Sequence, residues 1–259
     1  MCWFQGWDSA PEIVQLCLES WKYHNPEWDI VLLDKGNIKQ YVDLDKVLPK
    51  TFMENTPAGY SDVLRIALLK EYGGVWADAT CFCNKPLSAW LFESMIDSWC
   101  YYRQDCDIAS WFIAAESDSY MVDLWYNKVI TYWQERLAGR DRMPGEYRWF
   151  HYLFVEARES DPKFNTLFNS WVKVDCTSFG SAAFAPKGAK VGARGLTAHL
   201  FTPYPKYLNE SLTPEIRGIL DSKIHAMYKL SHKYHIDWGK EDTSLKYLIK
   251  SIGINLIIE

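Results

Sequence analysis

The sequence lacks any apolar run of about 18 residues or more, so no segment has the length and character of a membrane-spanning helix. Its first residues also lack the basic stretch followed by an apolar run that marks a secretory signal. We therefore expect a chain that neither spans a membrane nor carries a visible export signal.

Cysteine pairs and concentrated positive charge are also missing. The seven cysteines are an odd number without CxxC spacing, which indicates neither a zinc site nor a complete disulfide framework. A reducing cytoplasm is the simplest interpretation. The net charge is -5, and the first 200 residues hold no cluster of Lys and Arg, which argues against nucleic acid as a partner.

The composition is that of a globular protein. The 259 residues are 48% apolar and 24% charged, enough to bury a sizeable core in one domain with a C-terminal appendage. The 13 Trp, 16 Tyr and 12 Phe would suit stacking on sugar rings and a nucleobase, but we expect most of them in the core.

Segments with strand and helix patterns alternate along the chain. Short apolar runs predict strands at 1–5, 28–33, 75–81 and 108–115, and helical spacing predicts helices at 8–24, 60–72, 84–99, 121–137 and 147–158. Residues 36–58 are expected to form a short helix and a loop. Either the natural chain begins upstream of Met1 or the first strand is short. The alternation predicts an α/β fold with a mainly parallel sheet.

Acidic and basic side chains gather around the expected helix 60–72 and the strand after it. Asp62 and Arg65 lie on one helical face, which alone would equally suit a solvated surface. Gly73-Gly74 ends the helix. On the expected strand, Trp76, Asp78 and Thr80 point to one side, at the carboxyl end where α/β sheets place ligands.

The pattern Ser61-Asp62-x-x-Arg65, then Gly73-Gly74, Trp76 and Asp78, resembles retaining type-A-fold glycosyltransferases related to Golgi outer-chain mannosyltransferases and clostridial glucosylating toxins. From Trp3 to the segment around Lys229, the chain is similar to the capsular polysaccharide synthesis protein family. The resemblance implies a nucleotide-diphospho-sugar transferase domain at 1–205. It also implies that a helical C-terminal segment, 206–259, closes the donor site.

The resemblance also implies roles for single residues. Asp62 would contact the ribose or donor sugar, Arg65 the sugar or diphosphate, and Asp78 the ribose and a divalent metal. Further donor contacts would come from Trp3, Phe4, Gln5 and Gly6, which would form the floor of the nucleobase pocket unless they are only a core strand, and from Trp76, Lys229 and Lys233. Lys229 and Lys233 would contact the diphosphate; a solvated basic helix face is their alternative.

On the acceptor side the resemblance places Trp149 and His151, although His151 among aromatics equally suits a structural role. The metal, Mn²⁺ or Mg²⁺, would have Asp78, Thr80 and His232 as ligands. Thr80 stands where many family members have a second aspartate, and a neutral hydroxyl weakens a site for a hard cation. Two arrangements stay open: Asp78 holds a metal with water and diphosphate, or basic residues act alone.

The function that the resemblance implies is a retaining hexosyltransferase, which transfers a sugar from a nucleoside diphosphate to a capsular, related or lipid-linked glycan. A catalytically impaired sugar-binding module is the alternative. A pyrophosphorylase would need a Gly-rich phosphate loop ending in Lys near the N-terminus, and the sequence has none. We expect a cytoplasmic location, with peripheral membrane contact if Leu245, Leu248, Ile249 and Ile252 face the membrane instead of packing on the domain.

Overall fold

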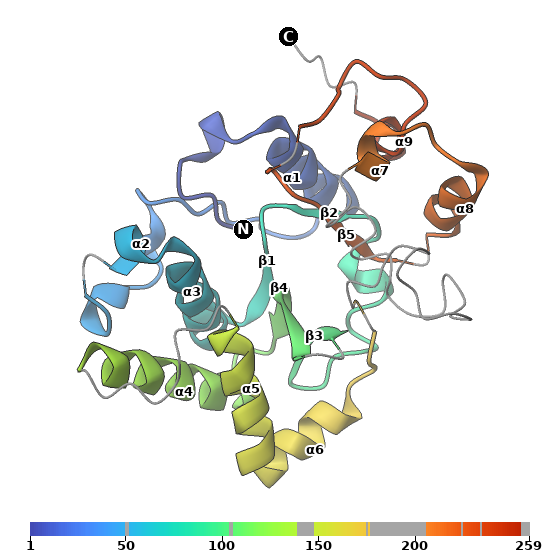
Figure 1. Cartoon of the computed structure of the whole chain (residues 1–259). Helices are drawn as coiled ribbons and strands as arrows, with labels where there is room; N and C mark the ends of the chain where they lie inside the picture. Colours follow the sequence, from blue (N-terminus) through green and yellow to red (C-terminus); the bar gives the residue numbers. More distant parts are fainter. Residues whose placement is uncertain are drawn as a thin grey trace. The chain divides into compact units, whose positions relative to one another are not determined.

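The computed structural model describes residues 1–49, 52–103, 106–138, 148–174, 176, 206–223, 225–233 and 235–254 (Figure 1). Contacts divide the chain into two units built from segments distant in sequence. Unit 1 comprises Met1–Leu32, Asp78–Glu93 and Val174–Glu259, and unit 2 comprises Leu33–Ala77 and Ser94–Lys173. The motif at 61–80 therefore contributes residues to both units. The division of functions at residue 205 stays a prediction.

The described part of unit 2 holds five helices and three strands. The helices are α2 (Phe52–Asn55), α3 (Pro57–Tyr72), α4 (Tyr120–Leu137), α5 (Trp149–Ser160) and α6 (Pro162–Ser170), and the strands are β1 (Gly74–Ala77), β3 (Ser98–Arg103) and β4 (Asp107–Ala115). Short 3-10 turns at Ile38–Gln40 and Leu44–Lys46 precede α2. Pro57 opens α3 because the fixed φ of proline suits a first helical turn.

The sheet of unit 2 is antiparallel in its described pairings. Its strand order is β1-β4-β3, with Gly74 opposite Ala115 and Ala77 opposite Phe112. β4 begins four residues after β3 ends, which is too short for the crossover that a parallel pair requires. The mixture of helices and sheet agrees with the prediction, whereas the mainly parallel sheet is not confirmed.

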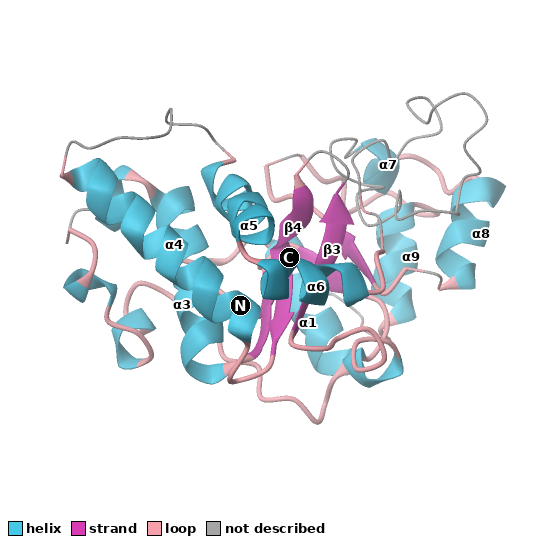
Figure 2. Cartoon of the chain, turned by 90° about the horizontal axis from the view of Figure 1, so that it is seen from below, coloured by secondary structure: helices cyan, strands magenta, loops and turns pink. Residues whose placement is uncertain are grey.

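The interior of unit 2 is largely aromatic. Trp125 is 4.2 Å from Phe150 between ring centroids, and Phe154 is 5.0 Å from both Trp125 and Phe164. Figure 2 shows α5, which carries two of these rings, beside β4. Across both units most tryptophans are buried, as expected: Trp7 and Trp21 in unit 1, and Trp76, Trp99, Trp111, Trp125, Trp133, Trp149 and Trp171 in unit 2.

Gly73, at the end of α3, has φ 65° and ψ -150°, a conformation that is essentially confined to glycine. A Cβ added there would lie 2.7 Å from the backbone nitrogen of Ser117. We expect Gly73→Ala to lower the free energy of unfolding by about 3 kcal/mol, measured by urea denaturation. Gly74→Ala is the matched control, because Gly74 also has positive φ but a Cβ there meets nothing within 4 Å. Equal losses in both variants would contradict the clash.

In its described residues, unit 1 combines four helices with a small sheet. The helices are α1 (Glu12–His24), α7 (Lys206–Asn209), α8 (Pro214–Ser222) and α9 (Ser244–Ser251), and strands β2 (Cys81–Cys83) and β5 (Met227–Lys229) pair antiparallel. Short 3-10 turns lie at Trp7–Ser9 and Leu87–Ala89. The C-terminal segment therefore contributes a strand as well as helices. Among the described residues, no helix combines the length and apolar character needed to cross a bilayer.

The core of unit 1 draws on the apolar faces of α1 and α9. Val14, Leu16 and Cys17 from α1 are fully buried, and Phe82 and Tyr228 join them from the small sheet. The four residues that offered a membrane-facing alternative lie in the same core, all at most 6% exposed: Leu245, Leu248, Ile249 and Ile252. Packing on the domain is therefore the role that the structure gives them.

Besides the continuous strand at 75–81, which ends at Ala77 and resumes at Cys81, three predicted elements are wrong. Residues 1–5 and 28–33 each hold a single bridge residue, Cys2 and Leu33, instead of a strand. The predicted helix at 84–99 is a loop with one 3-10 turn that leads into β3. Asp97 has φ 129°, which no helix accommodates, and the aromatic sequence of Ser98–Arg103 suits a buried strand better.

Just before β5, the side chain of His225 is 6% exposed, and its Nε2 has no hydrogen-bond partner among the described residues. Burial, helped by the charge of Lys85, lowers the pKa of His225 from 6.5 to about 4. The unfolded chain therefore binds more protons than the folded chain between these two values. The contribution of the neutral His225 to the free energy of unfolding is therefore fully present above pH 6.5 and is lost as the pH falls towards 4.

The free energy of unfolding of the native chain should fall between pH 7 and pH 4.5. In His225→Gln we expect this fall to be about 2 kcal/mol smaller, because the buried imidazole is absent. Urea titrations at the two pH values measure this difference. His235→Gln is the control, because His235 is exposed. Identical pH dependence in His225→Gln and the native chain would show that His225 does not contribute.

Candidate functional site

The turn between β1 and β2 carries the acidic part of the motif. β1 ends at Ala77 and β2 begins at Cys81, and the Cys81 amide donates a hydrogen bond to the Asp78 carbonyl over 2.9 Å. The predicted continuous strand at 75–81 is therefore wrong. Because residues 78–80 form a turn, the alternation of side chains along a strand does not apply to Asp78 and Thr80.

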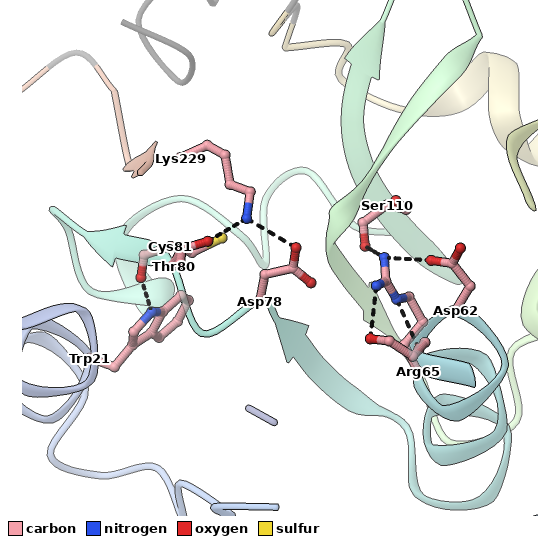
Figure 3. Close-up of polar contacts among 9 residues, drawn as sticks. Trp21, Asp62, Arg65, Asp78, Thr80, Cys81, Ser110 and Lys229 are labelled. Carbon is pink, nitrogen blue, oxygen red and sulfur yellow. Dashed lines mark hydrogen bonds and ion pairs between the residues drawn. The ribbon is translucent and has the colours of Figure 1, made fainter. Parts of the chain in front are cut away.

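Strand β5 brings Lys229 to this turn. Lys229 lies opposite Cys81 in the β2–β5 pairing, and the Leu230 amide donates to the Thr80 carbonyl over 2.8 Å. The Lys229 Nζ lies 3.0 Å from Asp78 Oδ2 and 2.5 Å from Thr80 Oγ1 (Figure 3). Three residues predicted for the donor site thus converge, although 149 positions separate Thr80 from Lys229.

The Asp78–Lys229 pair is partly shielded from water. The side chains are 27% and 16% exposed. Burial, the largest single influence, lowers the pKa of Lys229. The charge and hydrogen bond of Asp78, together with Cys81 and Cys17, outweigh burial, so that the pKa lies above its usual value. Lys229 therefore carries an ammonium charge throughout the neutral range.

Helix α1 anchors β2, the strand that follows this turn. The Trp21 indole donates to the Cys81 carbonyl over 2.7 Å, and the Ser20 hydroxyl accepts from the Cys83 amide over 2.8 Å. All four residues are buried. The backbone that carries Asp78 and Thr80 is therefore held by interior hydrogen bonds, which suits a site that must keep its geometry.

The N-terminal segment contributes a turn, with Gly6 donating its amide to the Trp3 carbonyl over 3.0 Å. The ring of Trp3 meets His232 edge to face at 4.9 Å between centroids. The Trp3 Nε1 is buried without a hydrogen-bond partner among the described residues. Of the other predicted residues here, Phe4 is half-buried, while Gln5 and Lys233 are exposed.

His232 is exposed, and burial of part of its ring together with Lys233 and Lys229 lowers its pKa below the usual 6.5. Its imidazole is therefore neutral at pH 7. A neutral ring can accept a hydrogen bond or bind a metal, but the contact that the structure assigns to it is the one with Trp3.

Asp62 and Arg65 form a separate cluster in unit 2. The Arg65 Nη1 lies 3.1 Å from Asp62 Oδ1 and donates to the Ser110 carbonyl over 2.7 Å, while Nε and Nη2 donate to the carbonyl and hydroxyl of Ser61 over 3.2 Å (Figure 3). The Arg65 side chain is 7% exposed. Arg65 thus links α3 to β4 and orients Asp62, and its contact with a donor stays a prediction.

The remaining predicted residues lie in the interior of unit 2. Trp76 is 4% exposed, with the Arg65 guanidinium carbon 5.3 Å from its ring centroid. Trp149 is 6% exposed and stacks on Tyr132 at 5.3 Å. His151 is half-buried on α5. The acceptor-side assignment of Trp149 and His151 stays a prediction.

The side chains do not fit a divalent metal in their present arrangement. Among the described residues, no group of three or more His, Cys, Asp or Glu side chains could hold a metal ion. The side-chain oxygens of Asp78 and Thr80 instead accept hydrogen bonds from the Lys229 ammonium. A hard cation would need further oxygen ligands from elsewhere.

Sequence reasoning missed the pairing of Lys229 with Asp78 and the role of Ser110. The first depends on β5, which is only three residues long and carries no periodic signal. The second uses a backbone carbonyl, which any residue type provides. Two clues to this pairing were available: the opposite charges of Asp78 and Lys229, and the resemblance that assigns both residues to the donor site.

Comparison with known proteins identifies relatives. The model of the capsular polysaccharide synthesis protein family matches residues 1–179. The O-glycosyltransferase braB of Annulohypoxylon truncatum is 34% identical over 92 residues, 31% of this chain and 22% of that protein. The probable glycosyltransferase FCK3 of Fusarium pseudograminearum (strain CS3096) is 25% identical over 152 residues, 52% of this chain and 38% of that protein.

The glycosyltransferase afumC of Aspergillus fumigatus (strain CBS 144.89 / FGSC A1163 / CEA10) is 26% identical over 153 residues, 51% of this chain and 39% of that protein. This chain thus spans less than half the length of each of these curated relatives. Among solved structures, the PaToxG Glycosyltransferase matches with a TM-score of 0.45 and 15% identity over 66% of this chain and 72% of that chain. Because the family model covers more than half of the sequence, the chain belongs to the capsular polysaccharide synthesis protein family.

Proposed function

We propose that this chain is a retaining glycosyltransferase that transfers a hexose from a nucleoside diphosphate sugar to a growing capsular, related or lipid-linked glycan. The observation that carries the proposal is the convergence of Asp78, Thr80 and Lys229 from distant parts of unit 1. The relatives named as glycosyltransferases support it. A cytoplasmic location, at most peripheral to the membrane, belongs to the same proposal.

The chemistry asks for a fixed positive charge. As the bond between the sugar C1 and the diphosphate oxygen breaks, negative charge grows on the diphosphate. Lys229 lies on the rigid strand β5, and Asp78 holds its ammonium group in place. The ammonium would therefore stabilise that charge without reorganising. In the reaction that we propose, the acceptor hydroxyl attacks the same face of C1, and its proton passes to the leaving diphosphate.

The aromatic turn beside this pair suits the nucleoside. Trp3 carries an indole N–H that is buried without a hydrogen-bond partner among the described residues. A bound nucleobase or ribose oxygen would satisfy that donor, which otherwise costs free energy. The His232 ring packs against the indole at 86° to its plane.

A panel of UDP-, GDP-, ADP-, CDP- and dTDP-sugars tests the proposal by thermal shift and by slow hydrolysis of the donor, each with Mn²⁺ and with EDTA. We expect at least one nucleotide sugar to raise the Tm and to be hydrolysed. A response to free sugars without a response to any nucleotide would favour the sugar-binding module and contradict the transferase.

A further inference from the structure

We propose that Lys229 is the resident cation of the donor site, and that this chain therefore binds the diphosphate of its donor without a divalent metal ion. The inference rests on the proposed function and adds to it that the Lys229 ammonium takes the place of a divalent metal ion in holding the diphosphate. It is carried by the position of one ammonium between two oxygens that a metal would otherwise use.

The first argument is charge balance. Where two carboxylates hold one divalent ion, the charges of the three groups cancel. Here the neutral Thr80 stands in place of the second carboxylate, so one negative charge is missing. Lys229 carries one positive charge where a metal ion would carry two, so the charges of Asp78 and Lys229 also cancel. The two departures from a metal site therefore compensate each other, which neither would do alone.

The second argument is space. The Lys229 Nζ is within hydrogen-bond distance of both Asp78 Oδ2 and Thr80 Oγ1. A divalent ion bound to the same two oxygens would lie within a few ångströms of the ammonium and be repelled by it. Metal binding would have to displace Lys229 from a site in which its side chain is 16% exposed.

The third argument is rigidity. Lys229 ends a strand whose other residues, Met227 and Tyr228, are fully buried, and Leu230 after it is 1% exposed. Its backbone is paired with β2, which α1 fixes in turn. The ammonium is therefore carried by a packed element and not by a mobile surface chain, which is the arrangement that preorganised charge stabilisation requires.

Isothermal titration of the native chain with UDP, GDP, ADP, CDP and dTDP, each in excess EDTA and in excess MnCl₂, tests the inference. We expect the nucleotide that binds to have the same Kd in both conditions. Mutation then locates the charge: Lys229→Met should weaken binding in EDTA about tenfold to a hundredfold, and Lys229→Arg should retain most of it. Lys250→Met, an exposed lysine on α9, is the matched control and should bind like the native chain.

The outcomes separate the two proposals. Binding that requires Mn²⁺ in the native chain overturns the inference alone and leaves the transferase in place. Binding by Lys229→Met as tight as that of the native chain also overturns the inference. If no nucleotide binds in either condition, the proposed function fails, and the inference fails with it. The comparison in the native chain needs no variant, so a misfolded Lys229→Met would not obscure the result.

Discussion

Replacing Asp78 with asparagine should lower kcat/KM for donor hydrolysis or transfer by about 100- to 1000-fold, with the fold intact. The substitution keeps the shape of the side chain but removes the charge that fixes the Lys229 ammonium 3.0 Å away. The ammonium would then keep the Thr80 hydroxyl as a neutral partner and lose its electrostatic anchor. A cation that is displaced or mobile stabilises the leaving diphosphate less well.

The measurement is the initial rate with the donor that the nucleotide panel identifies, together with a urea titration of each variant. Asp29→Asn is the matched control, because Asp29 is an exposed carboxylate of the same unit. We expect native rates in the control and a change in unfolding free energy of at most about 1 kcal/mol in Asp78→Asn, since the pair is partly exposed. Native activity in Asp78→Asn would show that the motif is assigned to the wrong residues.

The strongly periodic helices could be predicted from the sequence. α1, α3 and α4 were each expected within a few residues of their observed bounds, because apolar residues repeat at helical spacing in all three. The predictions of strands at 1–5 and 28–33 were wrong because a short apolar run does not distinguish a strand from a buried irregular segment. Strand direction could not be read either, since it depends on which partner each strand finds.

The candidate site could also be predicted only in part: the residues could be named, but not their contacts. Asp78 and Lys229 were named from a local pattern and a resemblance, and the structure brings their side chains together. Their mutual contact could not be predicted, because it is created by a pairing between segments far apart in the chain. Arg65 illustrates the opposite case: it belongs to the same pattern, yet the hydrogen bonds that the structure gives it are internal.

These internal bonds predict a structural effect at Arg65. Arg65→Ala should lower the free energy of unfolding by about 3 kcal/mol, because it removes the guanidinium that pairs with the Asp62 carboxylate, which is only 17% exposed. It also removes the donors to the carbonyls of Ser61 and Ser110. Arg65→Lys should recover only part of the loss, since one ammonium cannot reproduce the fork that reaches both carbonyls and the carboxylate.

Urea denaturation followed by tryptophan fluorescence measures this loss, and α3 itself offers a control. Lys70 is on the same helix and pairs with Asp123, but that pair is 36% and 53% exposed, so Lys70→Ala should cost less than about 1 kcal/mol. Adding Asp62→Asn to Arg65→Ala should restore stability if the stranded carboxylate is the main cost. If the double variant is no more stable than Arg65→Ala, the lost bonds to the carbonyls account for the effect. If Arg65→Ala costs no more than Lys70→Ala, Arg65 does not hold α3 to β4, and its guanidinium would again be a candidate for direct contact with the donor.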